Sequence, residues 1–473
     1  MDVKRFLFGF SILFLLVVCD VSANMVLNVK HKFAGQKPST SAMKEHDSLR
    51  HQRILYDVNL PLEGNGLVNS TGLYYTQFGI GTPSKTYYVQ VDTGSDVLWV
   101  NCVGCKKCPT SSSLGVNLQL YDPKASSTAQ DVSCQQQFCT IANGVVPSCT
   151  ASSSMPCSFS LTYGDGSSAS GYYVNDVIQY GQVTTNGTSP TNTSLIFGCA
   201  DTRTGNLASS NGALDGILGM GPAKTSFVSQ LASAGLVSDT FAHCLAGASG
   251  DGIFVIGEVA QPKVNSTPLI PNQELYNVNM ESVDVGGTAL QIPASAFTNQ
   301  ETIIDSGTTL AYLTDAIYVP LMNAVTAQYP NLMNQTYPCL PYAGSVDTGF
   351  PTVTFNFQNS LSLTVYPHDY MIYDQGQWCI LWQDSSSLAA GAMNLNILGD
   401  LVLSNKLVVY DLENSTIGWT EYNCSSSIAL QTGPSGATSL VGSPANPSSA
   451  WSLDVERFIT FLLLTVVLAA YFN

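Results

Sequence analysis

The amino-acid sequence predicts an all-β protein made of two homologous lobes. The body of the chain is poor in charge, rich in Gly, Ser, Thr and Asn, and divided into short apolar runs between turn signals. An internal repeat supports two lobes, because Val91-Asp92-Thr93-Gly94-Ser95 is matched by Ile303-Ile304-Asp305-Ser306-Gly307-Thr308. An apolar-apolar-Gly triplet follows each copy, Ile217-Leu218-Gly219 in one half and Ile397-Leu398-Gly399 in the other. The repeated order indicates that each lobe supplies one Asp to a shared interface.

Each repeat is a carboxylate on a tight loop between strand-like segments. The Gly lets the backbone approach a partner closely, and the neighbouring hydroxyls can bond the backbone or the carboxylate. One such loop would be ordinary turn chemistry, so its repetition carries the information. Two carboxyls held close together share a proton, because like-charge repulsion raises one pKa. The pair can then act as general base and general acid in one site.

These paired motifs resemble those of the pepsin-like aspartic peptidases, whose two lobes each supply a D-[TS]-G-[ST] loop. The resemblance covers roughly residues 74 to 423. It implies a bilobal fold with the active site between two pseudo-symmetric lobes, and an aspartic-type endopeptidase with an acidic optimum and no cofactor. Asp92 and Asp305 are the implied catalytic pair. The implied supporting residues are Thr93, Gly94, Ser95, Ser306, Gly307 and Thr308.

The resemblance also gives these supporting residues roles. Ser95 and Thr308 are expected to bond the outer oxygens of the two carboxyls, and Thr93 and Ser306 to cross-bond the two loops. Ser306 in place of Thr is a small departure that we expect to be harmless.

A third element is Leu161-Thr162-Tyr163-Gly164-Asp165-Gly166-Ser167. Asp-Gly between alternating apolar and polar residues is a strong hairpin signal. The plain interpretation is a surface hairpin of a β domain. The resemblance instead implies the flap that closes over substrate, with Tyr163 packing over the cleft and Gly164 beside it.

Only two segments look helical. Ser226 to Ala234 follows Pro222 and stops at Gly235, and Thr314 to Tyr329 opens with Thr314-Asp315 as a cap. Pro320 predicts a kink or break in the second helix.

The N-terminus differs in composition from the body. Lys4 and Arg5, the apolar run from Phe6 to Cys19 and then Val21-Ser22-Ala23 have the layout of a secretory signal peptide, with cleavage expected after Ala23. A membrane anchor is the alternative, but the run is shorter than the roughly 20 apolar residues that a spanning helix needs.

The next segment, up to about residue 60, is basic, whereas residues 61–450 contain 8 Lys or Arg and 26 Asp or Glu. This contrast suggests an electrostatic partner within the chain, whose hold weakens as carboxylates protonate in acid. The resemblance likewise implies a propeptide, and a solvated tail is the alternative. The predicted organisation is a signal peptide at 1–23, a propeptide at 24–68 with an approximate end, an N-terminal peptidase lobe at 69–268 with a Cys-rich insertion at 102–139, a C-terminal peptidase lobe at 269–424, a Ser/Gly/Pro-rich stalk at 425–450, and an anchor signal at 451–473.

The cysteines indicate an oxidising compartment. The sequence contains 13 cysteines. Cys19 is expected to leave with the signal peptide, and the remaining twelve are an even number that can form six disulfides. The crowded spacing from Cys102 to Cys139 could be a zinc site, but no His lies nearby, which favours disulfides. The twelve are Cys102, Cys105, Cys108, Cys134, Cys139, Cys149, Cys157, Cys199, Cys244, Cys339, Cys379 and Cys424.

The connectivity of these cysteines cannot be read from the sequence. The Cys-rich insertion resembles the nepenthesin-type plant members of the family. The family resemblance implies the pairs Cys339–Cys379 and Cys199–Cys424.

Seven Asn-x-Ser/Thr sequons fit the same route, and several are expected to carry glycans. They are Asn69, Asn186, Asn192, Asn265, Asn334, Asn414 and Asn423.

The C-terminus predicts a glycosylphosphatidylinositol anchor. Small residues at Ser448-Ser449-Ala450 precede a short polar spacer from Trp451 to Arg457 and an apolar tail from Phe458. Ser448 is the candidate attachment residue, and upstream small residues such as Gly442 and Ser443 are the alternatives. A spanning helix is the alternative, but the tail is short for one and no basic cluster follows it. The expected location is therefore the outer face of the plasma membrane.

The remaining charged residues contain no second catalytic set. Asp96, Asp215 and Asp400 lie near the motifs without the Asp-hydroxyl-Gly order, so we interpret them as structural. His243 and His368 are the only histidines outside the leader, and neither a metal set nor a phosphate loop stands out.

The acidic body argues against nucleic acid as a partner. The expected partner is a polypeptide substrate in extended conformation, bound by a monomer. The rival is a catalytically silent binding or inhibitor protein on the same fold, and a purely structural surface glycoprotein would leave the repeated Asp loops unexplained.

Overall fold

The computed structural model describes residues 56–67, 71–144, 149, 155–184, 187–209, 211–298, 300–329, 332, 338–388, 394–432 and 437–442. The predicted signal peptide, most of the predicted propeptide and the anchor signal lie outside these residues, as do Asn69, Asn186, Asn334 and Ser448. In the part of the chain that is described, no helix is long and apolar enough to cross a membrane.

The two repeats lie at the centres of two similar strand arrangements. In the first half, β10 (Gly216–Gly219) runs parallel to β4 (Lys85–Asp92) and antiparallel to β5 (Trp99–Lys106). In the second half, β25 (Asn396–Leu398) is likewise parallel to β17 (Thr302–Ile304) and antiparallel to β18 (Ala311–Leu313). Each apolar-apolar-Gly triplet therefore pairs along the strand that delivers an Asp. The predicted all-β, two-lobed architecture is confirmed.

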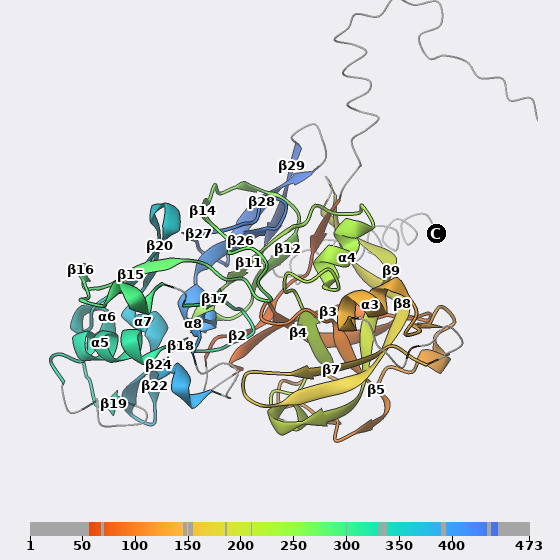
Figure 1. Ribbon diagram of the computed structural model, residues 1–473, viewed down its shortest axis with the longest axis horizontal. Helices are drawn as coiled ribbons and strands as arrows, with labels where there is room; N and C mark the ends of the chain where they lie inside the picture. Colours follow the sequence, from red (N-terminus) through yellow and green to blue (C-terminus); the bar gives the residue numbers. More distant parts are fainter. Residues whose placement is uncertain are drawn as a thin grey trace, which may run out of the picture. The chain divides into compact units, whose positions relative to one another are not determined.

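A long ribbon of three strands dominates the first lobe (Figure 1). It consists of β7 (Ser158–Thr162), β8 (Ser168–Thr184) and β9 (Gly187–Thr204), with β8 and β9 paired along their whole length. Further strands of this lobe's sheet are β2 (Glu63–Asn65), β3 (Leu73–Ile80) and β6 (Gln130–Asp131). The ribbon's turn between β7 and β8 is the predicted flap.

Strands from both halves form one continuous sheet beneath the two Asp loops. In order they are β14 (Asn265–Pro268), β27 (Thr416–Glu421), β26 (Lys406–Asp411), β11 (Thr240–Leu245), β12 (Gly252–Ile256) and β1 (Asp57–Asn59). Phe241 of β11 stacks on Tyr410 of β26, with ring centroids 4.4 Å apart. The sheet is thus fixed by aromatic packing as well as by its ladder hydrogen bonds.

The second lobe adds smaller sheets. One consists of β15 (Met280–Val285), β16 (Thr288–Ala289), β20 (Val353–Phe357) and β21 (Leu361–Val365), and another of β19 (Cys339–Leu340), β22 (Met371–Asp374) and β23 (Gln377–Ile380), while β24 (Trp382–Asp384) pairs with β18.

Both predicted helices are present. Helix α4 (Phe227–Ser233) begins after Ser226, whose hydroxyl accepts a hydrogen bond from the Ser229 amide. Helix α5 (Asp315–Val325) begins after Thr314 and runs through Pro320 without a break. Of the predicted kink or break, the break is therefore wrong. Among the described residues, the α-helices that were not predicted are the short α3 (Gln137–Asn143), α6 (Val346–Gly349), α7 (Pro367–Tyr370) and α8 (Asp400–Leu403).

The segment predicted as a flexible stalk begins as a folded hairpin. Strand β28 (Ser427–Thr432) pairs with β29 (Ala437–Gly442) and with β13 (Val259–Gln261), which the stalk prediction did not allow. Ile428, Leu430 and Val441 are buried. The small polar residues around them hide an alternating apolar pattern, and that pattern decides the structure.

The last part of the predicted propeptide also belongs to the sheet. Strand β1 pairs with β8 on one side and β12 on the other, and Val58, Leu60 and Leu62 are buried in the core.

All twelve cysteines of the body are paired, which excludes a zinc site between Cys102 and Cys139. The bonds are Cys102–Cys199, Cys105–Cys108, Cys134–Cys149, Cys139–Cys157, Cys244–Cys424 and Cys339–Cys379. Cys339–Cys379 is as expected from the resemblance.

The expected Cys199–Cys424 bond is wrong. Cys199 lies on β9, which pairs with β5, and this pairing brings it to Cys102. Cys424 follows β27 and meets Cys244 on β11.

Candidate active site

Each Asp loop holds its carboxylate in the same way. The Asp92 Oδ1 atom accepts a hydrogen bond from the Gly94 amide at 2.9 Å, and Oδ2 accepts one from the Ser95 hydroxyl at 2.5 Å. The Asp305 carboxylate repeats this arrangement with the Gly307 amide at 2.7 Å and the Thr308 hydroxyl at 2.6 Å. The structure therefore gives Ser95 and Thr308 the roles that the resemblance implies.

The two loops approach each other closely. A Cβ added at Gly94 would lie 2.7 Å from Asp305 Oδ2, and one added at Gly307 would collide with Asp92 Oδ1. Each Gly is thus required by the carboxylate of the other lobe. The two carboxyls face one another across the lobe interface, and both side chains are more than nine-tenths buried.

Thr93 joins the loops from below. Its hydroxyl accepts a hydrogen bond from the Ser306 amide at 2.9 Å and donates to the Ile304 carbonyl at 3.5 Å. Ser306 takes part only through its backbone, because its own buried hydroxyl has no hydrogen-bond partner. The expected reciprocal bond from the Ser306 side chain is therefore absent, and the cross-link is one-sided.

Burial changes the protonation of the pair. Desolvation raises the pKa of Asp92, and the neighbouring Asp305 carboxyl raises it further, against lowering by the Ser95 and Gly94 hydrogen bonds. Desolvation also raises the pKa of Asp305. A buried pair of this kind retains one shared proton to higher pH than two isolated carboxyls would. It is therefore suited to donate and accept protons in the same site.

The flap tyrosine lies beside the dyad. Tyr163 is half-buried, and its hydroxyl accepts a hydrogen bond of 2.8 Å from Trp99 Nε1. Burial raises the pKa of Tyr163, and the nearby Asp92 charge raises it further, so the hydroxyl stays protonated. Gly164 is at the exposed tip, where a Cβ would meet nothing within 4 Å. Trp99, which follows the first Asp loop, is a site residue that the sequence motifs did not reveal.

Of the three acids interpreted as structural, Asp400 is influenced by the charges of both Asp92 and Asp305. Asp96 Oδ1 accepts the Ala223 amide, and Asp215 accepts the amides of Tyr88 and Gln119. Asp400 at the start of α8 is fully buried, and its Oδ1 has no hydrogen-bond partner. Burial raises its pKa well above the ordinary value, and the charges of Asp305 and Asp92 raise it further. Asp400 is therefore a buried carboxyl close to the dyad whose pKa is raised.

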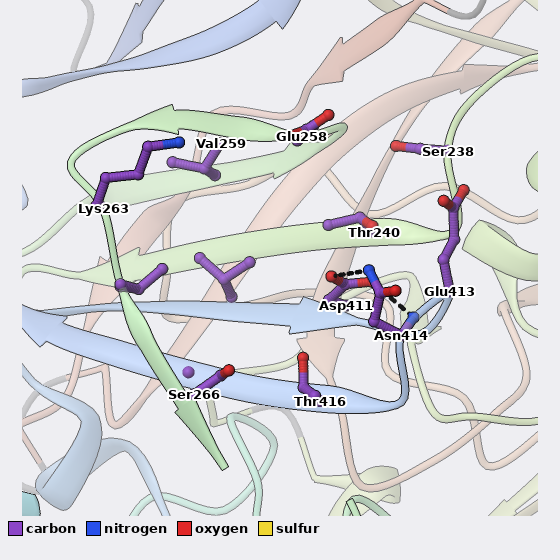
Figure 2. Close-up of a pocket in the computed structure, with 13 residues that line it drawn as sticks. Ser238, Thr240, Glu258, Val259, Lys263, Ser266, Asp411, Glu413, Asn414 and Thr416 are labelled. Carbon is purple, nitrogen blue, oxygen red and sulfur yellow. Dashed lines mark hydrogen bonds between the residues drawn. The ribbon is translucent and has the colours of Figure 1, made fainter. Parts of the chain in front are cut away.

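A polar cavity of about 300 Å³ lies elsewhere, over β11, β13, β14, β26 and β27. Figure 2 shows its charged lining, with Glu258 and Lys263 on one side and Glu413 on the other. It contains no residue of the Asp loops or the flap. Asn414, one of the predicted glycosylation sites, lies at this cavity with its Nδ2 donating to Asp411 Oδ2 at 2.7 Å (Figure 2).

Each lobe presents a buried carboxyl from an Asp-hydroxyl-Gly loop, and a tyrosine hairpin lies beside the pair. This arrangement is the active-site architecture of the pepsin-like aspartic proteases. Comparison with known proteins agrees. The family described as "Xylanase inhibitor N-terminal" matches residues 74–258, and "Xylanase inhibitor C-terminal" matches residues 275–421. The chain belongs to this xylanase-inhibitor-like branch of the pepsin-like aspartic protease family.

Its relatives include named proteinases. Aspartic proteinase 36 of Arabidopsis thaliana is 44% identical, with 98% of each chain covered. Aspartic proteinase 39 of the same plant is 41% identical over 99% of each chain. Aspartic proteinase nepenthesin-1 of Nepenthes gracilis is 28% identical, covering 81% of this chain and 85% of its own.

Solved structures share the fold. Basic 7S globulin from soybean is 24% identical with a TM-score of 0.59, covering 78% of this chain and 97% of its own. The structure titled edgp is 19% identical with a TM-score of 0.60, covering 78% of this chain and 96% of its own.

Proposed function

We propose that the protein is an active aspartic endopeptidase that hydrolyses peptide bonds with a water held between Asp92 and Asp305. The ionised member of the pair removes a proton from the water, which attacks the peptide carbonyl, while the protonated member gives its proton to the carbonyl oxygen. The tetrahedral intermediate then breaks down as a proton passes to the departing amine. No covalent enzyme intermediate and no cofactor is needed.

One observation supports this proposal above the others, namely the mutual approach of the two loops. Gly94 and Gly307 leave room only for the opposite carboxylate, and all four hydrogen bonds that orient the two carboxylates are formed. Preorganised groups of this kind need no rearrangement when the reaction begins. The substrate is expected to lie extended in the cleft, where backbone bonds give affinity and side-chain pockets give preference.

Activity should be restricted to acid. The chemistry needs one proton on the pair, so ionisation of the second carboxyl abolishes it as pH rises. We expect the protein without residues 1–23 to cleave a mixed peptide library between pH 3 and 6. Asp92→Asn or Asp305→Asn should each lower kcat by at least about 1,000-fold. The exposed Glu281→Gln on β15 is the matched control and should leave turnover unchanged.

The rival function is binding or inhibition without catalysis. The name of the matching family and the globulin among the solved structures are the reasons to weigh it. A correctly folded protein that cleaves nothing in the library at any pH, with wild-type and Asp305→Asn alike, would favour this rival.

We further infer that the protein is made as a secreted zymogen. The basic leader precedes a body with many more acids than bases, and acidification removes the negative charge that would hold it. Because β1 completes the central sheet, we expect activation to cut before Tyr56 and leave that strand in place. In the library assay, the leader-bearing precursor should be inactive near neutral pH and gain activity after acidification. Equal activity with and without the leader at every pH would make the leader a simple tail.

The final part of this proposal is a lipid tether on the outer cell surface. Residues 443–473 follow the folded hairpin, so a stalk, if present, begins after Gly442 rather than at Ser425. Phosphatidylinositol-specific phospholipase C should release the mature protein from membranes, because the apolar tail would have been exchanged for the lipid. Recovery of tail peptides from the mature protein, without release by the lipase, would indicate a spanning segment instead.

N-glycosylation belongs to the same proposal. The sequon residues Asn192, Asn265, Asn414 and Asn423 are exposed. Mass shifts on enzymatic deglycosylation, mapped to peptides, would identify those that are used, and an unshifted protein would contradict the proposal.

A further inference from the structure

A single arginine is buried behind the flap. Arg203, at the end of β9, is the only arginine among the described residues, and it is 3% exposed. Burial of a guanidinium is costly unless its donors are satisfied. Its Nη1 donates to Asn101 Oδ1 at 3.2 Å and to the Leu214 carbonyl at 3.4 Å, but its Nε has no hydrogen-bond partner. Of the described carboxylates, none forms an ion pair with it.

Besides these two hydrogen bonds, Arg203 contacts the indole of Trp99. Its Cζ lies 5.2 Å from the centre of the Trp99 ring, within the range of a cation–π interaction. Trp99 is fully buried, and its Nε1 is the donor that holds the Tyr163 hydroxyl. The guanidinium, the indole and the phenol therefore form one chain that ends at the flap.

The sheet keeps these three residues together. Arg203 is paired with Ala169 of β8, which is paired with Leu161 just before the flap turn. Trp99 of β5 is paired with Gly198 of β9, and a side chain at Gly198 would press on the Trp99 Cβ at 2.9 Å. Backbone pairing thus fixes the position of the Trp99 Cβ. The direction of the Nε1–H bond also depends on contacts with the ring, such as that of Arg203.

We propose that Arg203 is a positioning residue for the flap, whose guanidinium holds the Trp99 indole so that Nε1 keeps the Tyr163 hydroxyl beside the dyad. This inference rests on the proposed peptidase function, because a held flap matters only if the dyad turns over substrate. A buried guanidinium without an ion pair is costly to retain, and the cation–π contact with the indole adds to its two hydrogen bonds and to the attraction of Asp215 in offsetting that cost.

The first test reads the flap directly and does not require activity. Arg203→Met keeps the length of the side chain and removes its charge and planar group. Hydrogen–deuterium exchange of the flap amides 161–167 should speed up at least about tenfold in this variant. The control is Lys406→Met on β26, which removes another buried cation whose Nζ donates to the Ser404 carbonyl. It should leave exchange in the flap unchanged.

The second test reads catalysis. With a peptide substrate, Arg203→Met should lower kcat/KM about tenfold with little change in the pH profile that the dyad sets. Arg203→Lys should recover part of this loss, because an ammonium retains the charge without the planar stacking. In a Tyr163→Phe background, which lacks the hydroxyl at the end of the chain, the effect of Arg203→Met should largely disappear.

The results separate the two proposals. Flap exchange equal in Arg203→Met and Lys406→Met, or losses of kcat/KM that multiply in the double variant, would overturn the positioning role while leaving the peptidase intact. Absence of Asp92-dependent cleavage by the wild-type protein would overturn the proposed function. The exchange experiment would still test whether Arg203 positions the flap. If Arg203→Met does not fold, Arg203→Lys is measured against Lys406→Arg in both assays, with faster flap exchange expected only in Arg203→Lys.

Discussion

The glycine of each Asp loop is the residue most tightly constrained by the opposite lobe. We expect Gly307→Ala to lower kcat/KM at least about 100-fold, because the added methyl would collide with Asp92 Oδ1 and push the carboxyls apart. Steady-state kinetics at acidic pH would measure the loss. Gly66→Ala is the matched control, since its methyl would meet only ordinary contacts beginning at 3.5 Å. Near-wild-type turnover in Gly307→Ala would mean that the carboxyls are not held as described.

At the scale of single residues, the sequence predicts the residues that belong to a motif and misses those that belong to none. Asp92 and Asp305 could be identified because their motif occurs twice, and the motif also contains their hydroxyl partners. Arg203 and Trp99 belong to no recognisable motif. They lie on different strands, and only the folded sheet brings them together. The sequence also could not show that the Ser306 hydroxyl forms no hydrogen bond, because hydrogen bonding depends on the side-chain rotamer.

At the scale of elements, the hairpin β28–β29 should contribute to stability. Leu430 is fully buried between β13 and β29, whereas Leu440 on the neighbouring strand is 72% exposed. We expect Leu430→Ala to lower the free energy of unfolding by about 2–4 kcal/mol and Leu440→Ala by less than about 0.5 kcal/mol. Urea unfolding of protein that ends at Gly442 would measure both. Equal and small effects of the two substitutions would indicate that this segment is a flexible stalk.

The errors in predicting elements have a common physical cause. Strand β28 was missed because Ser and Gln flank a short apolar run and the composition of the segment suggests a linker, although Ile428 and Leu430 keep the period of two. The Cys199–Cys424 pair was wrong because disulfides follow strand neighbours, and which strand lies beside β9 is a tertiary fact. Helix α4, with a Ser cap and a Gly stop, depends on local signals and was predicted almost to the residue.

For the molecule as a whole, the duplicated sequence motif becomes a shared site through contacts between the halves. The Thr309 hydroxyl donates to the Gly72 carbonyl, and Gln90 Nε2 donates to the Gly307 carbonyl at 3.3 Å. The Tyr276 hydroxyl reaches back to the Met220 carbonyl at 2.7 Å. Each Asp loop is therefore held partly by residues of the other half, so the paired carboxyls depend on both halves of the chain.

The whole molecule should be more stable in mild acid than at neutral pH, because the buried groups that titrate between these pH values are mostly carboxyls. Burial raises the pKa of Asp57 to about 7 and that of Asp215 to about 6, and it raises those of Asp92, Asp305 and Asp400 as well. In the unfolded chain such carboxyls titrate near a pKa of about 4. The folded state therefore binds more protons between pH 4 and 7, so the free energy of unfolding falls as pH rises through this window.

His243 opposes this trend. Burial lowers the pKa of His243 to about 3, whereas an unfolded histidine titrates near about 6.5, so His243 removes stability as pH falls between these values. Several carboxyls outweigh one histidine, and we expect the free energy of unfolding at pH 4.5 to exceed that at pH 7 by about 2–4 kcal/mol. Urea midpoints at pH 4.5, 5.5 and 7 would measure the difference. Asp57→Asn should reduce it, and His243→Phe should enlarge it, because each variant removes one side of the balance. A midpoint that is equal or higher at pH 7 would mean that these carboxyls are ionised in the folded protein.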